Sequence, residues 1–375
     1  MKNILFAVLF SGCVSSPSVQ TAAQTVVADS SAVDSVIVVA DTLKMLFAGD
    51  VMGHGMQITG AWRDGGDSCY NYHPSFQWVK DYVSAADLAI ANLEVTFGGA
   101  PYTGYPQFST HESLADALRD AGFDVLLTAN NHALDRGKKG MERTIDILDG
   151  INMPHTGTFK DSADRRRNHP LIVEKNNFRL AMLNYTYGTN GIPVEKPNIV
   201  NFIDTVRMAA DLIAAQNMEP DFIITCIHWG DEYKTTENAY QRKIASFLAR
   251  HGCDLIVGSH PHVVQPLSKI PSCKGDSIYV IYSLGNFISN MRDRYRNGGI
   301  TLEITLTKND GKVSVESAGY EPFFVYRYPL KGVSVFRLLG INHYLQNTEL
   351  YPAFNQTDKN LIMQFYNDTK KIMSF

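Results

Sequence analysis

Short apolar segments alternate with amphipathic segments along most of the chain. The apolar segments have the length of β-strands, are bounded by charged or turn-forming residues, and occupy residues 44–48, 87–92, 124–129, 179–184, 222–227, 254–257 and 278–284. Between them, apolar side chains recur every three or four residues, as on one face of a helix, at residues 76–85, 113–121, 141–148, 204–215 and 240–250. This alternation predicts an α/β domain.

The pattern changes towards the C-terminus. Residues 300–306 and 312–317 alternate apolar and polar side chains, and the Asn-Asp-Gly segment at residues 309–311 is typical of a hairpin turn. We therefore expect a small antiparallel hairpin at the end of a main domain that spans residues 43–332. Residues 333–375 are expected to form a helical C-terminal appendage in two pieces.

The N-terminus has the features of an export signal. Lys2 supplies a basic start, residues 4–10 form an apolar run, and small residues precede Cys13. The apolar run is too short for a permanent transmembrane helix, because crossing about 30 Å of hydrocarbon needs about 20 residues. Residues 14–42 are rich in Ser, Ala, Thr and Val without helical periodicity, and we expect them to form a flexible linker.

Residues 1–13 also resemble the signal and lipobox of bacterial lipoproteins, in which the cysteine is acylated. Phe10 stands where leucine is usual. The resemblance implies a lipid anchor on Cys13 and a location at the membrane of the cell envelope. The alternative is an ordinary cleaved signal in which Cys13 is incidental.

Composition limits the possible partners. Thirty-four basic residues stand against 38 acidic ones, a net charge of -4, so no overall positive field exists to hold a nucleic-acid backbone. Nucleic acid is therefore not expected as a partner. With 375 residues and 45% hydrophobic content, the chain can bury a large core.

Residues able to bind a metal ion or transfer a proton follow almost every apolar segment. In α/β sheets, ligands collect just past the carboxyl ends of the strands, so these side chains should meet at one edge. Imidazole with carboxylate and amide oxygens suits Zn, Mn or Fe better than Ca or Cu(I), and we expect one or two divalent ions of that kind. The candidate ligands are Asp50, His54, Glu94, Asn131, His228, His260 and His262.

Each of these elements also has a purely structural interpretation. Glycine and aspartate after a strand commonly form a turn, and Asn131 with His132 is compatible with a helix cap. His260 and His262 favour a metal more strongly, because two imidazoles so close compete for protons unless a cation replaces them. Together with His132 and His228 they make four histidines at strand ends, which cannot all be explained as core histidines.

Several of these residues lie in segments whose order along residues 43–290 is highly specific. The segments are Gly49-Asp50-Val51-Met52, Asn92-Leu93-Glu94, Ala129-Asn130-Asn131-His132, Tyr185-Thr186-Tyr187-Gly188-Thr189-Asn190-Gly191, His228-Trp229-Gly230 with Glu232-Tyr233, Gly258-Ser259-His260-Pro261-His262 and Ser283-Leu284-Gly285-Asn286-Phe287. In this order they resemble the CapA family of bacterial capsule (poly-γ-glutamate) synthesis proteins. That family is in turn similar to the calcineurin-like metallophosphoesterases.

The resemblance implies a fold and a division of the ligands. The fold is a four-layer α/β arrangement, in which a two-sheet β-sandwich is flanked by helices and has a two-metal site at its edge. Glu94 would bridge the two ions, and His132 would protonate the leaving group. The ligands implied for the first ion are Asp50 and His262, and those for the second are Asn131, His228 and His260.

Two positions depart from the phosphoesterase pattern. Met52 stands where those enzymes have a histidine, and Glu94 stands where they have an aspartate. The first ion therefore lacks one expected ligand. Either His54 replaces it, or a strand-to-helix turn points His54 away and the enzyme is mononuclear.

Other polar residues near these segments suggest catalytic and substrate-binding roles. His132 is the expected proton donor, held by Asp135 or by a backbone acceptor. Trp229, Glu232 and Tyr233 follow a metal ligand directly and are expected to line the pocket.

The leading hypothesis is an exported metal-dependent hydrolase that acts on an anionic cell-envelope substrate. The substrate is a small molecule or a polymer, with either a phosphoester or a poly-γ-glutamate-like amide bond. Arg292, together with Arg294 and Arg296, either receives this anion by bidentate contacts or belongs to a solvated loop of mixed charge.

The alternative is a membrane-anchored assembly or export factor for capsule polymer, without catalysis and with a vestigial metal site. Other capsule-synthesis proteins would then be its partners. Met52 is the sequence feature that favours this hypothesis. A simple binding protein for a glutamyl or sugar ligand is a third possibility.

Overall fold

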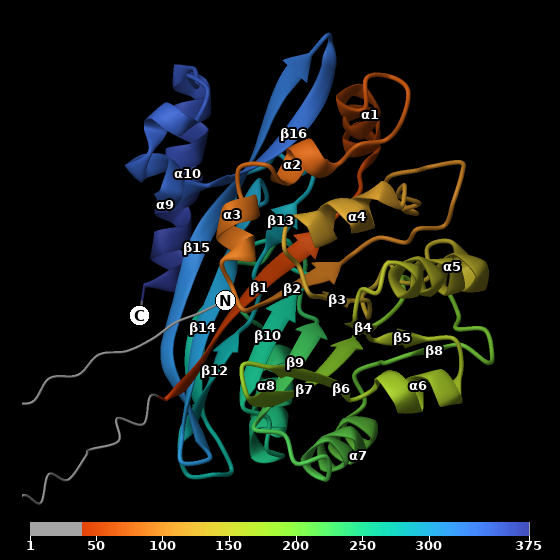
Figure 1. Cartoon of the computed structure of the whole chain (residues 1–375), viewed down its shortest axis with the longest axis vertical. Helices are drawn as coiled ribbons and strands as arrows, with labels where there is room; N and C mark the ends of the chain where they lie inside the picture. Colours follow the sequence, from red (N-terminus) through yellow and green to blue (C-terminus); the bar gives the residue numbers. More distant parts are fainter. Residues whose placement is uncertain (1–39, 375) are drawn as a thin grey trace, which may run out of the picture. The chain divides into compact units, whose positions relative to one another are not determined.

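A computed structural model describes residues 40–374 of the chain. Cys13, the expected signal segment and nearly all of the expected linker lie outside the described residues. Two β-sheets form the centre of the described part, and helices flank both of them (Figure 1). The first strand begins at Asp41, slightly before the predicted domain start at residue 43. None of the described helices is both long and apolar enough to cross a membrane.

The first sheet has eight strands in the order β16-β15-β14-β1-β2-β3-β4, with β13 paired to β1. Strands β1 to β4 and β13 run parallel, whereas β14, β15 and β16 join them in antiparallel pairs. The bounds are β1 Asp41–Val51, β2 Leu88–Leu93, β3 Val125–Leu127, β4 His155–Thr156, β13 Asn286–Ile288, β14 Gly298–Asn309, β15 Lys312–Leu330 and β16 Val333–Gly340.

The second sheet has six strands in the order β11-β12-β10-β9-β7-β6. Its central strands run parallel, and the edge strands β6 and β11 are antiparallel to their neighbours. The bounds are β6 Leu171–Lys175, β7 Phe178–Thr186, β9 Phe222–His228, β10 Leu255–Ser259, β11 Leu267–Pro271 and β12 Ser277–Ile281. A separate two-stranded sheet consists of β5 Thr158–Phe159 and β8 Ile199–Val200.

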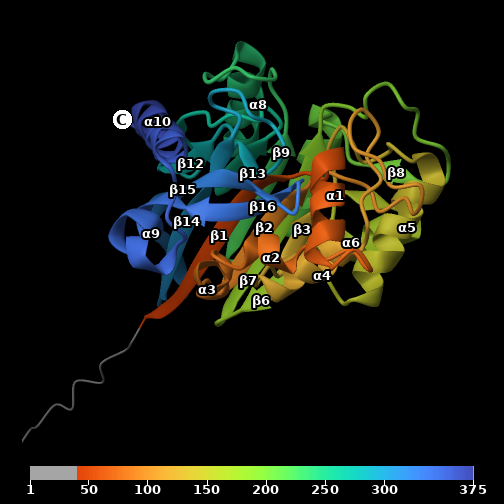
Figure 2. The same ribbon diagram turned by 90° about the horizontal axis from the view of Figure 1, so that it is seen from above.

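Helices cover the outer face of each sheet. Helices α1 to α4 pack on the first sheet (Figure 2), and α7 and α8 pack on the second (Figure 1). Helix α10 runs beside β15 at the antiparallel end of the first sheet (Figure 1). The bounds are α1 Gly55–Asp64, α2 His73–Phe76, α3 Lys80–Ser84, α4 Ser113–Asp120, α5 Gly137–Gly150, α6 Ser162–Asn168, α7 Thr205–Gln216, α8 Ala239–Arg250, α9 Ile341–Gln346, the 3-10 turn η1 Thr348–Leu350 and α10 Gln356–Met373.

Alternate side chains of the strands point into two different cores, because successive residues of a strand face opposite sides of the sheet. In β1, Met45 and Phe47 pack between the two sheets, whereas Leu46 and Ala48 pack on the outer face with the helices. Strands β7 and β9 divide their residues in the same way between the central core and helices α7 and α8. Burial on both faces explains the continuous apolar segments of the sequence. The predicted four-layer α/β sandwich is confirmed.

The hairpin predicted near residue 310 is present and is longer than expected. Strands β14 and β15 pair from the turn at Asn309 and Lys312 back to Gly298 and Phe324. This long hairpin carries the C-terminal residues onto the main sheet.

The C-terminal segment differs from the prediction. Val333–Gly340, expected to begin a helical appendage, is strand β16 and pairs antiparallel with β15. Lys331 and Gly332 between these strands have positive φ values of 49° and 80°, which is the backbone of a tight hairpin turn. Valine residues in the segment favour a strand over a helix. The two expected helical pieces, α9 and α10, begin only at Ile341.

Helix α10 contributes to the central core. Its Ile362 and Phe365 are buried together with Phe324 of β15 and Leu339 of β16. The described residues accordingly form one compact unit, in which the C-terminal helices stabilise the same sandwich that carries the strands.

Phe365→Ala should lower the free energy of unfolding by about 3–5 kcal/mol, because it removes a buried ring and leaves a cavity. Leu361→Ala, at an exposed position of the same helix, is the matched control and should change it by less than about 0.5 kcal/mol. Urea denaturation followed by circular dichroism measures both. If Phe365→Ala melted α10 alone and left the main transition unchanged, α10 would be an appendage.

Glu321 of β15 adds a pH dependence to this C-terminal packing. Its buried carboxylate accepts hydrogen bonds from the backbone N and the Nδ2 of Asn342, at 2.8 and 2.7 Å. Burial raises the pKa of Glu321 from 4.5 to about 7, and the hydrogen bonds oppose this rise only in part. The folded state therefore favours the protonated carboxyl, and that stabilisation is lost as the pH rises from 4.5 through 7.

Glu321→Gln mimics the protonated side chain and should remove this dependence. The free energy of unfolding of the wild type, relative to that of the variant, should fall by up to roughly 3 kcal/mol between about pH 5 and about pH 8. Denaturant titrations at several pH values measure the difference. A difference that stays constant over this range would contradict the assignment.

Candidate metal centre

Strands of both sheets end at one edge, where six polar side chains gather. They are Asp50 in β1, Glu94 after β2, Asn131 after β3, His228 at the end of β9, and His260 and His262 after β10. Each of the six residues is no more than 3% exposed. The structure thus brings together all of the predicted metal ligands except His54.

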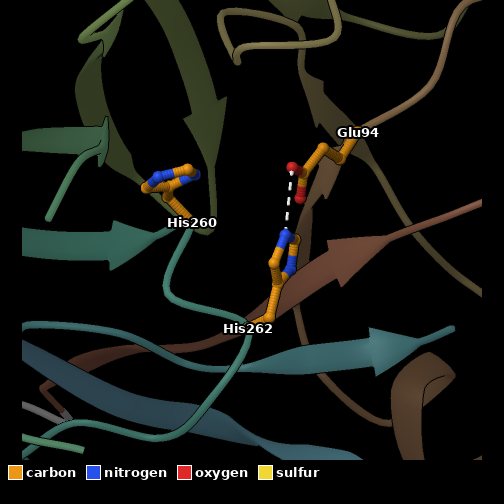
Figure 3. Close-up of side chains that lie close together, drawn as sticks. All are labelled: Glu94, His260 and His262. Carbon is orange, nitrogen blue, oxygen red and sulfur yellow. Dashed lines mark ion pairs between the residues drawn. The ribbon is translucent and has the colours of Figure 1, made fainter. Parts of the chain in front are cut away.

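Glu94 lies between the imidazoles of two histidines, His228 and His262. Its Oε1 atom is 3.4 Å from Nε2 of His228 and 3.7 Å from Nε2 of His262. In Figure 3, Glu94 faces His262, and His260 lies beside them on the chain that follows β10. Ligand atoms of Glu94, His260 and His262 all lie within 4.8 Å of one another. Asp50, Glu94 and His228 meet the same criterion, so Glu94 belongs to both groups. This grouping differs from the division that the resemblance implies, in which His262 accompanies Asp50 and His260 accompanies His228.

Two asparagines orient the ligands around Asp50. Nδ2 of Asn92 donates to Oδ1 of Asp50 at 2.7 Å, and Oδ1 of Asn286 lies 3.1 Å from Nδ1 of His262. The second oxygen of Asp50 is also 3.1 Å from that Nδ1. Asn92 in β2 and Asn286 in β13 are the register partners of Asp50. The sequence alone assigns neither a role, because their proximity to Asp50 depends on which strands are neighbours.

The loop after β7 supports the ligands on the other side. Oδ1 of Asn131 lies 2.7 Å from Nε2 of His228, and Nδ2 of Asn131 donates to Oδ1 of Asn190 at 3.2 Å. The half-exposed ring of Tyr187 packs on His260, with 4.5 Å between ring centroids. Tyr187 and Asn190 lie in a segment that carries the family resemblance, but their contacts are visible only in the fold.

The residues present fit a divalent cation. Both carboxylate oxygens of Glu94 and Nδ1 of His260 are buried without a hydrogen-bond partner among residues 40–374. Such unpaired groups cost about 1–3 kcal/mol each. His260 and His262 also have positive φ values of 102° and 56°, a strain that persists mainly at functional sites. A cation compensates the unpaired atoms, and imidazole with carboxylate donors suits Zn, Mn or Fe.

The protonation states also suit metal binding. Burial, followed by the neighbouring imidazoles, lowers the pKa of His228 well below its usual range and that of His260 to about 3. Both rings are therefore neutral at neutral pH, which is the form that coordinates metals. Burial and the adjacent Asp50 carboxylate raise the pKa of Glu94 well above its usual range. For Asp50, burial is outweighed by contact with His262, and its pKa is lowered.

His132 and Asp135 form a buried pair at the wall of a cavity. Nδ1 of His132 is 2.7 Å from Oδ2 of Asp135, and that oxygen also accepts the backbone N–H of Phe108 at 2.7 Å. Asp135 therefore holds the ring through one nitrogen and leaves Nε2 available. The cavity has a volume of about 420 Å³, and its walls include Asn131, His132, Asp135, Asn190 and Glu232.

Trp229 does not line the pocket, contrary to the prediction. It is fully buried beside the second sheet and its indole Nε1 donates to the backbone oxygen of Tyr282 at 2.9 Å. Successive residues of a strand point to opposite faces, so the register that turns His228 towards the ligands turns Trp229 away. By contrast, Glu232 lines the cavity, and the ring of Tyr233 stacks on His262 with 6.1 Å between centroids.

His54 lies outside the ligand groups. Its Nδ1 is 3.1 Å from Oε1 of Gln57, and the residue caps the N-terminus of α1. Burial lowers the pKa of His54 to about 4. Met52 is buried among apolar residues on the outer face of the first sheet. The ligands implied for the first ion, Asp50 and His262, therefore gain no histidine from either position.

Arg292 lies away from the cavity beside His132. It is exposed, and its Nη2 is 3.6 Å from Sδ of Met56 in α1. Arg294 forms a bidentate ion pair with Asp368 of α10, and Arg296 is paired with the neighbouring aspartate at position 293. Three arginines that are close in the sequence thus have different surroundings in the fold.

Comparisons with known proteins identify relatives of the chain. It is 27% identical over 326 residues to the PGA biosynthesis protein CapA of Bacillus subtilis, covering 82% of this chain and 74% of that protein. It is also 27% identical over 255 residues to the capsule biosynthesis protein CapA of Bacillus anthracis, covering 66% and 60%. A solved calcineurin-like phosphoesterase from Bacillus subtilis resembles it with a TM-score of 0.45 and 14% identity, over 88% of this chain and 98% of that one.

The family model described as bacterial capsule synthesis protein PGA_cap matches residues 44–291, which hold all six clustered ligands and the His132–Asp135 pair. As its motifs predicted, the chain belongs to this family of bacterial capsule synthesis proteins.

Proposed function

We propose that this protein is a metal-dependent hydrolase that acts on an anionic substrate of the bacterial cell envelope. The observation that carries the proposal is the buried ligand cluster around Glu94, which adjoins a cavity lined by His132 and Asp135. Metal-assisted hydrolysis requires a binding site for a cation and a proton donor beside it. The unpaired atoms of Glu94 and His260 offer the first, and His132, oriented by Asp135, offers the second. The expected export signal supports a location outside the cytoplasm.

The cation would be held by the six clustered residues. They are Asp50, Glu94, Asn131, His228, His260 and His262. When bound there, a divalent ion supplies positive charge that activates water and neutralises charge developing on the attacked group. Asn92 and Asn286 keep Asp50 and His262 in place by the contacts described above.

His132 supplies the proton in this mechanism. Asp135 accepts the Nδ1–H of the ring, so His132 acts as the acid in its imidazolium form: its Nε2 proton passes to the departing oxygen or nitrogen, and the neutral ring remains bound to Asp135 through Nδ1. The half-exposed rings of Tyr187 and Tyr233 pack on His260 and His262 and limit the access of bulk water to the ligands. The substrate is proposed to be a phosphoester or a γ-glutamyl amide, because the named relatives act in capsule and PGA biosynthesis.

One observation favours a second function. Met52 is part of the apolar core, and His54 is engaged with Gln57, so neither supplies the histidine that the phosphoesterase pattern expects beside Asp50. An incomplete first site suits a capsule polymer assembly or export factor, anchored to the membrane through Cys13, in which the metal no longer performs chemistry.

Metal binding should raise the thermal stability of the wild type and depend on the clustered residues. At a hundredfold excess of Mn or Zn over Kd, the gain is roughly 2.7 kcal/mol. His260→Ala and Glu94→Gln should lose this gain, whereas His251→Ala, which removes an exposed histidine of the chain, should keep it. Without metal, Glu94→Gln should be at least as stable as the wild type, because it removes an unpaired buried acid.

Differential scanning calorimetry and metal content by mass spectrometry measure these effects. An unchanged metal content in both His260→Ala and Glu94→Gln would remove the basis for the ligand assignment.

His132→Asn should lower kcat by about 10²- to 10⁴-fold while the metal content stays at the wild-type level, because the ring donates a proton and holds no ion. Turnover of aryl phosphoesters and of γ-glutamyl peptides, each with Mn and with Zn, is the measurement. His251→Ala serves as the control and should leave kcat unchanged. If the metal-loaded wild type hydrolyses neither substrate class, the result would favour the hypothesis of an assembly or export factor.

A further inference from the structure

Arg292 and Arg327 lie beside the segment that follows β13 and have no charged partner among the described residues. Neither guanidinium is ion-paired with a carboxylate in the part of the chain from residue 40 to residue 374. Their neighbours are paired: Arg294 with Asp368, Arg296 with Asp293 and Arg337 with Asp64. The missing counter-charge is therefore specific to these two arginines and not a general property of this surface.

The two side chains are held close together by the segment after β13. Nη1 of Arg327 in β15 donates to the backbone oxygen and to Oδ1 of Asn290, both at 3.2 Å. Arg292 follows two residues later and lies against Met56 of α1. Burial, and then the charge of Arg292, lower the pKa of Arg327 to about 10. A partly buried cation beside a second cation is costly unless an anion joins them.

The position of the pair links it to the catalytic edge. Strand β13 pairs parallel with β1 at Asp50. The residues that follow β13, up to Asn290, therefore begin at the edge of the sheet that carries the metal ligands. The backbone N of Asn290 lies 3.3 Å from Nδ1 of His54. His54 in turn contacts the ring of Phe108, which packs edge-on against His132. The segment that holds the arginine pair is thus connected to His132 through His54 and Phe108, and this layer of side chains separates it from the reacting groups.

We propose that Arg292 and Arg327 form a second anion-binding subsite, which holds a carboxylate or phosphoryl group of the substrate away from the bond that is cleaved. Two guanidinium groups present a planar set of N–H donors, which matches the oxygens of either group. The assignment of the bound anion to the substrate rests on the proposed function. It requires a substrate that carries at least one carboxylate or phosphoryl group in addition to the bond that is cleaved.

Binding measured without turnover tests the subsite. The full-length protein is kept metal-free with a chelator, and fluorescence anisotropy reports the binding of a labelled γ-linked glutamate decamer and, separately, of labelled inorganic polyphosphate. Arg292→Gln and Arg327→Gln should each weaken binding by about tenfold to a hundredfold. Arg250→Gln is the matched control, because Arg250 in α8 also lacks an ion pair among the described residues and donates a hydrogen bond to Ser246 of its own helix.

The fold of the variants is checked by thermal unfolding. Arg327→Gln should unfold at the wild-type temperature or higher, because it removes an uncompensated charge, and Arg327→Lys should retain most of the binding. Arg292→Gln changes an exposed residue and keeps the test decisive if Arg327→Gln is unstable.

Binding of the glutamate chain alone identifies carboxylates as the ligand, and binding of polyphosphate alone identifies phosphoryl groups. Either result supports the subsite if the binding depends on both arginines. Wild-type protein that binds neither probe, or losses no larger than that of Arg250→Gln, would overturn it. Arginine-dependent binding without any hydrolysis would refute the proposed hydrolase and leave the subsite standing. If hydrolysis depends on His132 but binding does not depend on the arginines, the subsite is refuted and the proposed hydrolase stands.

Discussion

The burial of two acidic side chains next to each other, Asp50 and Glu94, is the constraint on which the site depends. Neither is accessible to solvent, and His228 and His260 beside them are neutral because burial lowers the pKa of both imidazoles. Burial and the neighbouring Asp50 carboxylate raise the pKa of Glu94, which disfavours a second negative charge. A divalent ion removes this conflict, and the unpaired oxygens of Glu94 are where it is most needed.

The sandwich makes this arrangement possible. Strands β1, β2, β9 and β10 are covered on both faces, so their ends are fixed by two cores at once. The pleat then decides which residues reach the site, as His228 and Trp229 show by pointing to opposite sides. The residues matched by the family model include the ligand cluster at this edge. Under the proposals above, a substrate with several anionic groups would contact both the metal centre and the arginine subsite.

Much of this was predictable from the sequence, because parallel strands expose their carboxyl ends at a common edge. That rule is sufficient to group Asp50 with His260, although 210 positions separate them along the chain. Features that depend on register or on strand neighbours were not predictable. They are the orientation of Trp229, the support that Asn286 gives to His262, and the proximity of Arg292 to Arg327 in β15. Strand β16 was predicted as a helix because its tight turn lacks the usual Asn-Gly or Asp-Gly signal.

The most direct test of the central claim is anomalous scattering from crystals of the protein grown with Mn or Zn, since it reports the element, number and ligands of bound ions together. The account predicts an anomalous peak within bonding distance of Glu94 and of His228, His260 or His262. Crystals that show no peak at Glu94, or a peak only at other residues, would contradict it.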